Sequence, residues 1–211
     1  MVWSSDLAYA IGLIVTDGSL SKDRRHLNLT SKDLEQIKTF AKILHLKNKI
    51  GIKSSSYSPK NKYYQIQFGN VKLYKFLLSI GLCPNKTKCI SKIKIPDKYF
   101  GDFLRGHLDG DGYTYSYWDI RWKNSFMLYT NFLSASKVHL EWIFDTIQRL
   151  YNLDGKINYA GKSVYKLIYA KKSSIILLSK LYYQDKLPYL KRKKDKIDLA
   201  LNTINYRMPG C

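Results

Sequence analysis

The chain has 211 residues, which is enough for one large domain or two small ones. Its apolar fraction of 45% and its 18 tyrosines can fill a hydrophobic core, and this argues against an intrinsically disordered protein. Lys and Arg total 36 against 16 Asp and Glu, a formal net charge of +20. A folded protein with this excess is expected to meet a polyanion, and nucleic acid is the commonest one.

The longest apolar run, residues 7–15, is shorter than the roughly 20 residues that a membrane-spanning helix needs, and acidic residues flank it. The chain also begins without the basic segment of a signal peptide. Its cysteines are odd in number and lack Cys-x-x-Cys spacing: Cys83, Cys89 and Cys211. We therefore expect reduced thiols, no structural zinc and an intracellular location, which organelle, bacterial and phage-infected cells satisfy equally.

In chain order, an apolar run with small residues four apart at 7–16 predicts a helix that ends at Asp17 and Gly18. After it we expect strands at 18–22 and 26–30, a helix at 34–44, a hairpin of 49–57 with 63–68, and a helix at 71–80. That helix is expected to stop at Gly81, since helices often end at glycine.

The second half repeats this order. We expect a helix at 100–109, strands at 113–118 and 125–133, a helix at 137–151, a hairpin of 156–159 with 164–170, and a helix at 174–182. A basic segment at 191–194 opens a last amphipathic helix. The pattern predicts an α+β fold of two pseudo-symmetric αββαββα subdomains, residues 1–82 and 99–211, joined by a linker at 83–98.

The helices that open the two halves share a stripe of small residues. Ala8 and Gly12 lie four residues apart in the first, and Gly106 and Gly110 occupy a matching stripe in the second. Glycine costs about 0.5–1 kcal/mol in a helix relative to alanine, so glycines at matched positions suggest a purpose. Close approach of two helix backbones is the simplest one, and it makes these residues the predicted helix interface.

Each of the two helices leads to an aspartate, Asp17 and Asp111, and these lie 111 − 17 = 94 positions apart. If the stripes face each other, both carboxylates lie at helix C-termini, where the partial negative charge repels them. Divalent metal would relieve that cost, an arrangement suited to hydrolysis of a phosphodiester. One Asp-Gly after a helix is commonly only a cap, so the prediction depends on the pair. Asp109 has apolar Val15 as its counterpart and is interpreted as structural.

Residues 11–18 (Ile-Gly-Leu-Ile-Val-Thr-Asp-Gly) and 104–112, which end in Asp-Gly-Asp-Gly, resemble the motifs of the LAGLIDADG homing endonucleases in their single-chain, two-motif form. The departures are Val15 at the first acidic position, and Arg105 and His107 at positions that are usually small or apolar. The resemblance spans nearly the whole chain, because three further segments are also similar to the family: 81–87, 103–106 and 187–193.

The resemblance implies that the motif helices pair between the subdomains and that the antiparallel sheets form a saddle in the DNA major groove. It implies that Asp17 and Asp111 bind divalent metal together with the carbonyl oxygens of Thr16 and Gly110. Mg²⁺ is the expected cofactor, with Mn²⁺ as a substitute and Ca²⁺ as an ion that binds without supporting turnover.

A peripheral basic residue that stabilises charge at the scissile phosphate is also implied by the resemblance. Lys191 is its counterpart in the second half and Lys86 in the first, and plain phosphate contact is the alternative for both. The cuts that the family makes are staggered across the minor groove and leave short 3′ overhangs.

Strand alternation separates a core face from a face that would meet the groove in such a saddle. Leu27 and Leu29 point to one side, so their strand neighbours point to the other. Polar side chains at these positions and in turns can contact base edges or phosphates. The predicted DNA-binding residues are Arg24, Arg25, His26, Asn28, Thr30, Lys49, Lys53, Tyr63, Gln65, Gln67, Arg121, Lys123, Lys156, Asn158 and Lys166. The register of residues 113–118 stays open, because both faces carry aromatic or hydroxyl groups.

The leading hypothesis is a monomeric, Mg²⁺-dependent, site-specific endonuclease that cuts both strands of a long asymmetric DNA target. An intron RNA maturase that binds structured RNA is a second hypothesis. A DNA-binding regulator without cleavage is a third, and the presence of both Asp17 and Asp111 argues against it. Double-stranded DNA is the expected partner, and no membrane is expected.

Overall fold

The computed structural model describes residues 1–54, 62–122 and 125–205. In the first half it contains α1 (Ser5–Asp17), β1 (Gly18–Leu20), β2 (His26–Ser31), α2 (Leu34–Ile43), β3 (Ile50–Ser54), β4 (Lys62–Gly69) and α3 (Val71–Ser79). The connecting segment holds a short helix, α4 (Lys86–Cys89), and a 3₁₀ turn, η1 (Asp97–Tyr99). The proposed boundaries at 82 and 98 stay a prediction.

The second half contains α5 (Phe100–Asp109), β5 (Tyr113–Trp118), β6 (Phe126–Ser134), α6 (Lys137–Tyr151), β7 (Lys156–Gly161), β8 (Val164–Tyr169), α7 (Lys171–Leu181) and α8 (Lys191–Asn205). The predicted αββαββα order is therefore confirmed in both halves. The last of these helices, α8, follows the second repeat and contacts β5.

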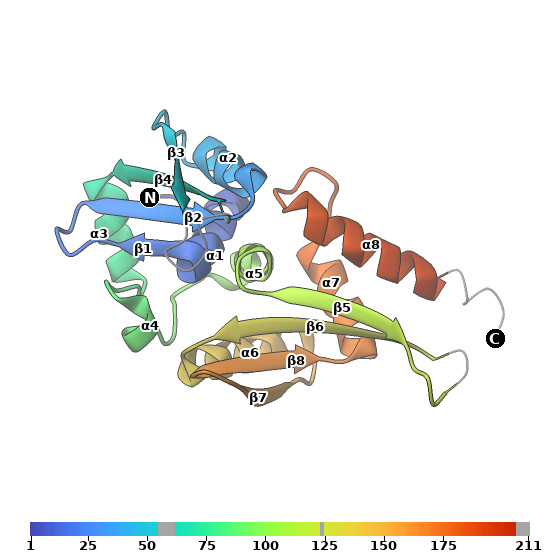
Figure 1. Cartoon of the computed structure of the whole chain (residues 1–211). Coiled ribbons are helices and arrows are strands. Elements are labelled where there is room, and N and C mark those ends of the chain that lie inside the picture. The colour runs from blue at the N-terminus through green and yellow to red at the C-terminus, as the bar shows by residue number, and fades with distance from the viewer. Residues whose placement is uncertain (55–61, 123–124, 206–211) are drawn as a thin grey trace.

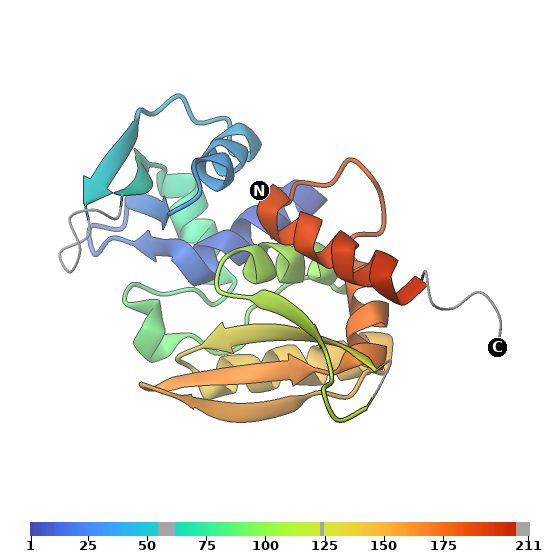
Figure 2. The ribbon, with the colours of Figure 1, turned by 45° about the vertical axis from the view of Figure 1, so that its right-hand side comes forward.

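The described strands form two four-stranded antiparallel sheets with equivalent topology, β1-β2-β4-β3 and β5-β6-β8-β7. The two sheets lie on opposite sides of the α1–α5 pair (Figures 1 and 2). One face of the first sheet is buried against its helices. Its side chains include Leu27 and Leu29 of β2 and Ile66 and Phe68 of β4. The predicted α+β class with paired helices between two subdomains is confirmed.

Helices α1 and α5 touch through their backbones. A Cβ built on Gly12 would lie 2.3 Å from the carbonyl oxygen of Phe103, and one built on Gly106 would lie 2.1 Å from that of Tyr9. Neither position can hold a side chain unless the helices separate. Ala8, on the same stripe of α1, is fully buried. The small residues therefore let the two helix axes approach closely.

The apolar run of residues 7–15 in α1 is buried between the two halves of the protein. No helix among the described residues is long and apolar enough to cross a membrane. A hydrogen bond from the Leu7 amide to the Ser4 hydroxyl, at 3.1 Å, caps the start of α1.

The second motif helix carries a buried ion pair where its sequence departs from the family pattern. Arg105 and Asp102 are both almost fully buried, and an Arg105 Nη2 donates to the Asp102 carboxylate at 2.8 Å. The guanidinium also donates to the carbonyls of Leu181 and Pro188, both at 2.8 Å. Arg105 thus fastens the segment between α7 and α8 onto α5, which offsets the cost of burying its charge.

The expectation of reduced cysteines is wrong for two of them. Cys83 and Cys89 form a disulfide whose Cα atoms lie 6.6 Å apart, and it closes the turn that leads into α4. The two cysteines are six positions apart in the sequence, so the bridge constrains only this turn. Cys211 lies outside the described residues. This spacing is not typical of a known disulfide motif, so the sequence did not indicate that the two cysteines pair.

Replacing Gly12 with alanine should lower the free energy of unfolding by about 2–3 kcal/mol, because the added carbon overpacks a backbone contact that cannot relax locally. Chemical denaturation followed by circular dichroism measures the change. Gly51→Ala is the matched control: a Cβ there meets nothing closer than the Gln65 carbonyl at 3.8 Å, and its effect should stay within about 0.5 kcal/mol. Equal stabilities of the two variants would contradict this account of the interface.

Candidate functional site

The two predicted carboxylates meet where α1 and α5 end. Asp17 is the last residue of α1, and Asp111 follows Gly110, the C-cap of α5. A Cβ built on Gly110 would lie 3.0 Å from Asp17 Oδ2, so the Asp17 carboxylate reaches the backbone beside Asp111. Burial, followed by the negative charge of Asp111, raises the pKa of Asp17 to about 7. Desolvation also raises the pKa of Asp111.

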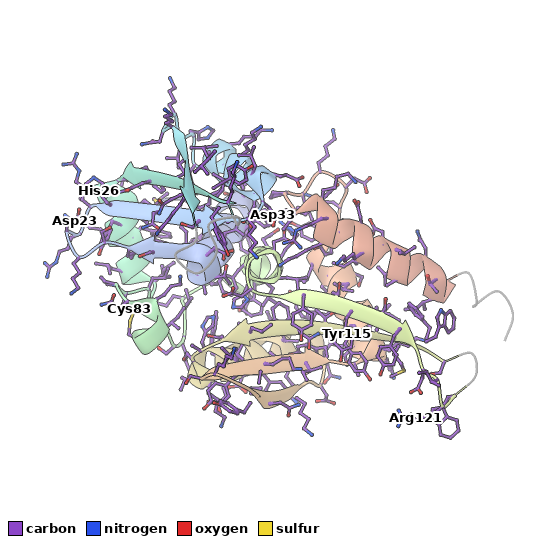
Figure 3. All side chains as sticks on the ribbon, viewed as in Figure 1. Asp23, His26, Asp33, Cys83, Tyr115 and Arg121 are labelled. Atoms are coloured by element: carbon purple, nitrogen blue, oxygen red, sulfur yellow. A yellow bond between two sulfur atoms is a disulfide. The ribbon has the colours of Figure 1, made fainter. Side chains whose placement is uncertain are left out.

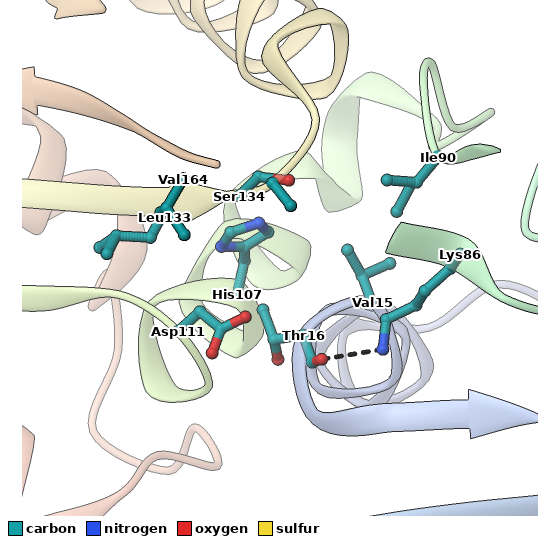
Figure 4. A pocket seen from close by; sticks show the side chains of 10 residues that line it. Val15, Thr16, Lys86, Ile90, His107, Asp111, Leu133, Ser134 and Val164 are labelled. Atoms are coloured by element: carbon teal, nitrogen blue, oxygen red, sulfur yellow. Dashed lines mark hydrogen bonds between the residues drawn. The ribbon is translucent and has the colours of Figure 1, made fainter. Parts of the chain in front are cut away.

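A partly buried lysine lies at the end of the first motif helix and offsets its partial negative charge. Lys86 Nζ, from α4, donates to the Thr16 carbonyl at 2.8 Å and also to the Gly18 carbonyl (Figure 4). These two carbonyls flank Asp17. A helix C-terminus carries a partial negative charge, so an ammonium placed there is favourable. Burial lowers the pKa of Lys86, and the charges of Asp111 and Asp17 oppose this.

Lys193 takes the equivalent place in the second half. Its Nζ donates to the carbonyl oxygens of four residues at the end of α5, at distances of 2.7–2.8 Å: Leu108, Asp109, Gly110 and Gly112. The last two are the 94-residue counterparts of the two carbonyls that Lys86 binds. Burial lowers the pKa of Lys193 to about 8. Each carboxylate of the pair therefore has one partly buried ammonium at its own helix end.

Lys191, predicted at this site, is placed elsewhere. Its exposed side chain forms an ion pair with Asp195 one helical turn later, at 2.7 Å. Residues two apart on a helix differ in direction by about 200°, so Lys191 faces away when Lys193 faces α5. The sequence did not show which lysine of the run lies at the end of α5, because it could not fix the rotation of α8 about its axis.

The donor set at the helix ends fits a hard divalent cation. Asp17 and Asp111 are the carboxylates, and the described residues contain no cluster of three or more His, Cys, Asp or Glu side chains that could complete a closed metal cage. Mg²⁺ is commonly held by one or two carboxylates and completed by water and substrate phosphate oxygens, so two carboxylates suffice. The carbonyls of Thr16 and Gly110, predicted as further ligands, already accept the two ammoniums.

Two hollows flank the carboxylate pair. One, of about 300 Å³, is lined by Asp111, Thr16, Lys86 and His107 among others (Figure 4). The other, of about 410 Å³, lies on the Asp17 side and is bordered by the ion pair between Arg192 and Asp33. The carboxylate pair is therefore bordered by a hollow on each side.

Asp109 connects α5 to α1 and to the segment before α8, in agreement with its interpretation as a structural residue. Its fully buried carboxylate accepts hydrogen bonds from the Tyr9 hydroxyl and the Leu190 amide, both at 2.8 Å. The first bond crosses the helix interface, and the second fixes the chain immediately before α8 begins. Burial raises the pKa of Asp109 to about 6, and these bonds oppose the shift.

The first sheet gathers its predicted polar residues on one face. Pairing of β2 with β4 and of β3 with β4 sets Asn28 beside Gln67, Thr30 beside Gln65, and Lys53 beside Tyr63. All of these lie on the face opposite the buried leucines of β2. The remaining predicted residues of this half are placed as follows: His26 at the start of β2, Arg24 and Arg25 exposed in the β1–β2 turn, and Lys49 exposed just before β3.

The second sheet is less uniform. Asn158 pairs with Lys166, and Lys156 pairs with Ile168, so these residues share one face. Arg121 is exposed in the β5–β6 turn and binds Asp119 at 3.0 Å (Figure 3). Lys123 lies outside the described residues. The register that the sequence left open sets the odd-numbered tyrosines of β5 on the same face as Lys156, and none of them was predicted as a binding residue.

Residues 4–81 match the family model of the LAGLIDADG-like domain. This segment of the chain is therefore similar to a LAGLIDADG-like domain. A search of curated proteins finds no match to the chain. Among solved structures, full-length DUF199/WhiA from Thermatoga maritima is similar over 100% of this chain, with 16% identity and a TM-score of 0.59. The chain spans 64% of that protein's length.

Two homing endonucleases have the same LAGLIDADG fold over both halves. Mesophilic variants of I-DmoI match 88% of this chain and 94% of their own, with 18% identity and a TM-score of 0.58. I-LtrWI bound to target DNA matches 96% of this chain and 91% of its own, with 13% identity and a TM-score of 0.59. The resemblance to the two-motif LAGLIDADG family is confirmed at the level of the fold and of the first domain.

Burial of Asp17 predicts a pH-dependent cost to stability. In the unfolded chain an aspartate keeps a pKa near 4, whereas the folded value is about 7. The folded state therefore binds this proton more tightly, and the free energy of unfolding of the metal-free protein should fall as pH rises from about 4 to 7. Asp17→Asn removes the charge and should gain on the order of 2 kcal/mol more at pH 8 than at pH 4, after allowance for solvent screening.

Denaturation of both proteins at the two pH values, with a chelator present, measures this difference. A gain of equal size at pH 4 and pH 8 would mean that Asp17 ionises normally in the folded protein. Asp154→Asn, a change at an exposed loop position, controls for general effects of pH on the comparison.

Proposed function

We propose that the protein is a site-specific DNA endonuclease that hydrolyses both strands of a long asymmetric target with the help of a divalent metal ion. The observation that supports this most strongly is the convergence of Asp17 and Asp111 at the ends of two touching helices, each beside its own partly buried lysine. A merely structural pair of helix ends has no need to hold two carboxylates there, one of which has its pKa raised by burial and then by the charge of the other.

The net charge and the sheet faces support DNA as the substrate. An excess of 20 positive charges favours a polyanion, and polar side chains of both sheets share faces that can follow a groove. The printed descriptions of I-LtrWI and I-WcaI state that those proteins are bound to target or recognition DNA. The different residues on the two sheets favour an asymmetric target, and a site completed by two halves of one chain favours a monomer.

Each group at the site has a proposed task. Asp17 and Asp111 hold Mg²⁺, which when bound supplies Lewis-acid stabilisation of the phosphate and a more acidic water. Lys193 and Lys86 hold the carbonyls at the two helix ends and provide positive charge where negative charge develops on the scissile phosphates. Lys193 thus takes the role expected for Lys191. The sheets hold the duplex in register so that both strands reach the carboxylate pair.

Cleavage of a randomised double-stranded DNA library in Mg²⁺ tests the proposed function. The expected result is enrichment of one cut site with short 3′ overhangs. Asp111→Asn should abolish cutting while binding to the selected duplex in Ca²⁺ persists, because the change removes a metal ligand and keeps the side-chain volume. Selective binding without any cutting by the unaltered protein would favour the regulator. Binding of structured RNA alone would favour the maturase.

A second test separates the two lysines of α8. Lys193→Met should lower the single-turnover cleavage rate by about 100-fold, which is the usual loss when one preorganised charge is removed. Lys191→Met is the matched control on the opposite face of the same helix, and it should change the rate by less than about threefold. A larger loss at Lys191 than at Lys193 would return the catalytic role to Lys191. Circular dichroism and DNA binding in Ca²⁺ establish that both variants are folded.

A further inference from the structure

Four tyrosines form a stacked row on the second sheet, and we call Tyr113, Tyr115, Tyr117 and Tyr129 the tyrosine ladder. Ring centroids of successive β5 tyrosines lie 6.0 and 6.2 Å apart, and Tyr129 of β6 stacks on Tyr115 at 4.9 Å with 13° between the ring planes. The three β5 rings are 36–43% exposed although they are large and aromatic. A soluble surface does not require such a row, so its order suggests a bound partner.

The tyrosine ladder lies on the face that would meet DNA. Tyr115 pairs with Tyr129 across the strands, and the same face continues through Asn131 and Ile168 to Lys156. Residues of alternate register, such as Leu128 and Phe132, are buried on the helix-covered side. In Figure 3, Tyr115 lies on β5 at the open side of the sheet. A hollow of about 370 Å³ beside Tyr129, lined also by Ile168, Ala170 and the Lys156 side chain, adds an apolar recess to this face.

The equivalent face of the first sheet has a different chemistry. Ser19 is the 94-residue counterpart of Tyr113, and β1 ends one residue later, at Leu20. The face continues with amide and hydroxyl side chains such as Asn28 and Gln65. The first sheet therefore offers side chains that form hydrogen bonds. On the second sheet, β5 and β6 offer aromatic rings, and β8 and β7 offer lysines.

We infer that the tyrosine ladder reads thymine methyl groups, so that the half of the target beneath the second sheet carries a thymine-rich block. This inference rests on the proposed function. The thymine C5-methyl is the one apolar group that a base pair presents in the major groove, and apolar side chains recognise it by contact. The lysines of the same face, Lys156 and Lys166, supply the positive charge that holds the phosphates.

The geometry also sets the length and place of the block. From Tyr113 to Tyr117 the strand advances about 14 Å, which matches about four base pairs along a duplex. Tyr113 follows Asp111 by two residues, so the tyrosine ladder begins beside the carboxylate pair and runs outward. The thymines are therefore expected in the base pairs next to the cut on one side. Stacking holds the rings in place before binding, which reduces the entropy lost on contact.

Deoxyuridine substitution tests this contact directly, because it removes the methyl group and leaves base pairing intact. The probe is the duplex selected in the cleavage experiment, and its dissociation constant is measured in Ca²⁺ by fluorescence anisotropy. Deoxyuridine in the half read by the second sheet should weaken binding about fourfold for each methyl group contacted, the value of burying one apolar carbon. The same change in the other half should have no effect. The library experiment is repeated with Tyr115→Ala. The half of the target in which this variant loses base preference is the half that the second sheet contacts.

Variants of the tyrosine ladder complete the test. In Tyr115→Ala the deoxyuridine penalty at the contacted position should disappear, whereas in Tyr115→Phe, which keeps the ring, it should persist. Tyr159→Ala is the matched control. Tyr159 is 63% exposed on the same sheet, but it lies on the face opposite the tyrosine ladder.

The outcomes separate this inference from the proposed function. A selected duplex that is bound and cut equally well with thymine or deoxyuridine in both halves overturns the inference alone. A penalty that persists in Tyr115→Ala overturns it as well. If no duplex is bound selectively, the proposed function falls and the inference falls with it. Preferential binding of single-stranded RNA through the tyrosine ladder would replace thymine methyl groups with unpaired bases as its ligand.

Discussion

The backbone contact between α1 and α5 is the constraint on which the rest of the structure depends. Gly12 and Gly106 remove the side chains that would hold the helices apart, so that their carbonyl ends lie next to each other. This brings Asp17 and Asp111 close to each other at the C-terminal ends of two helices, which carry partial negative charge. The arrangement buries Asp17 and places the charge of Asp111 near it, and these two effects, burial first, raise the pKa of Asp17. Two partly buried lysines, Lys86 and Lys193, offset part of this negative charge.

The lysines reach the site by different routes. Lys86 arrives from a short helix whose turn is closed by the disulfide between Cys83 and Cys89. Lys193 arrives from α8, and buried polar groups of α5 fix where that helix begins: Arg105 holds the carbonyl of Pro188, and Asp109 holds the amide of Leu190. Arg105, a departure from the family motif, and Asp109, which keeps it, thereby both support the second lysine. Pseudo-symmetry of the site is thus produced by unlike segments of the chain.

The two sheets share a topology and differ in the surface they present. Amide and hydroxyl side chains on the first sheet suit hydrogen bonds to base edges, and such contacts lose their value if a base is exchanged. Aromatic side chains on the second sheet suit contact with apolar groups, which depends less on direction and on salt. A single chain can combine both on one surface because its halves vary independently, which a symmetric dimer cannot do.

The sequence by itself determined the repeat, the order of the helices and strands, and the pairing of the motif helices, because hydrophobic periodicity and a 94-residue offset are local or regular properties of the chain. It also determined Asp17 and Asp111 as the pair to examine. Only the tertiary structure placed Lys193, and not Lys191, at the carbonyls that end α5, because this depends on how α8 is rotated against α5. It likewise paired Cys83 with Cys89 and set the tyrosines of β5 on the open face. Strand register and helix rotation are fixed by contacts between distant segments, and no local pattern of residues records them.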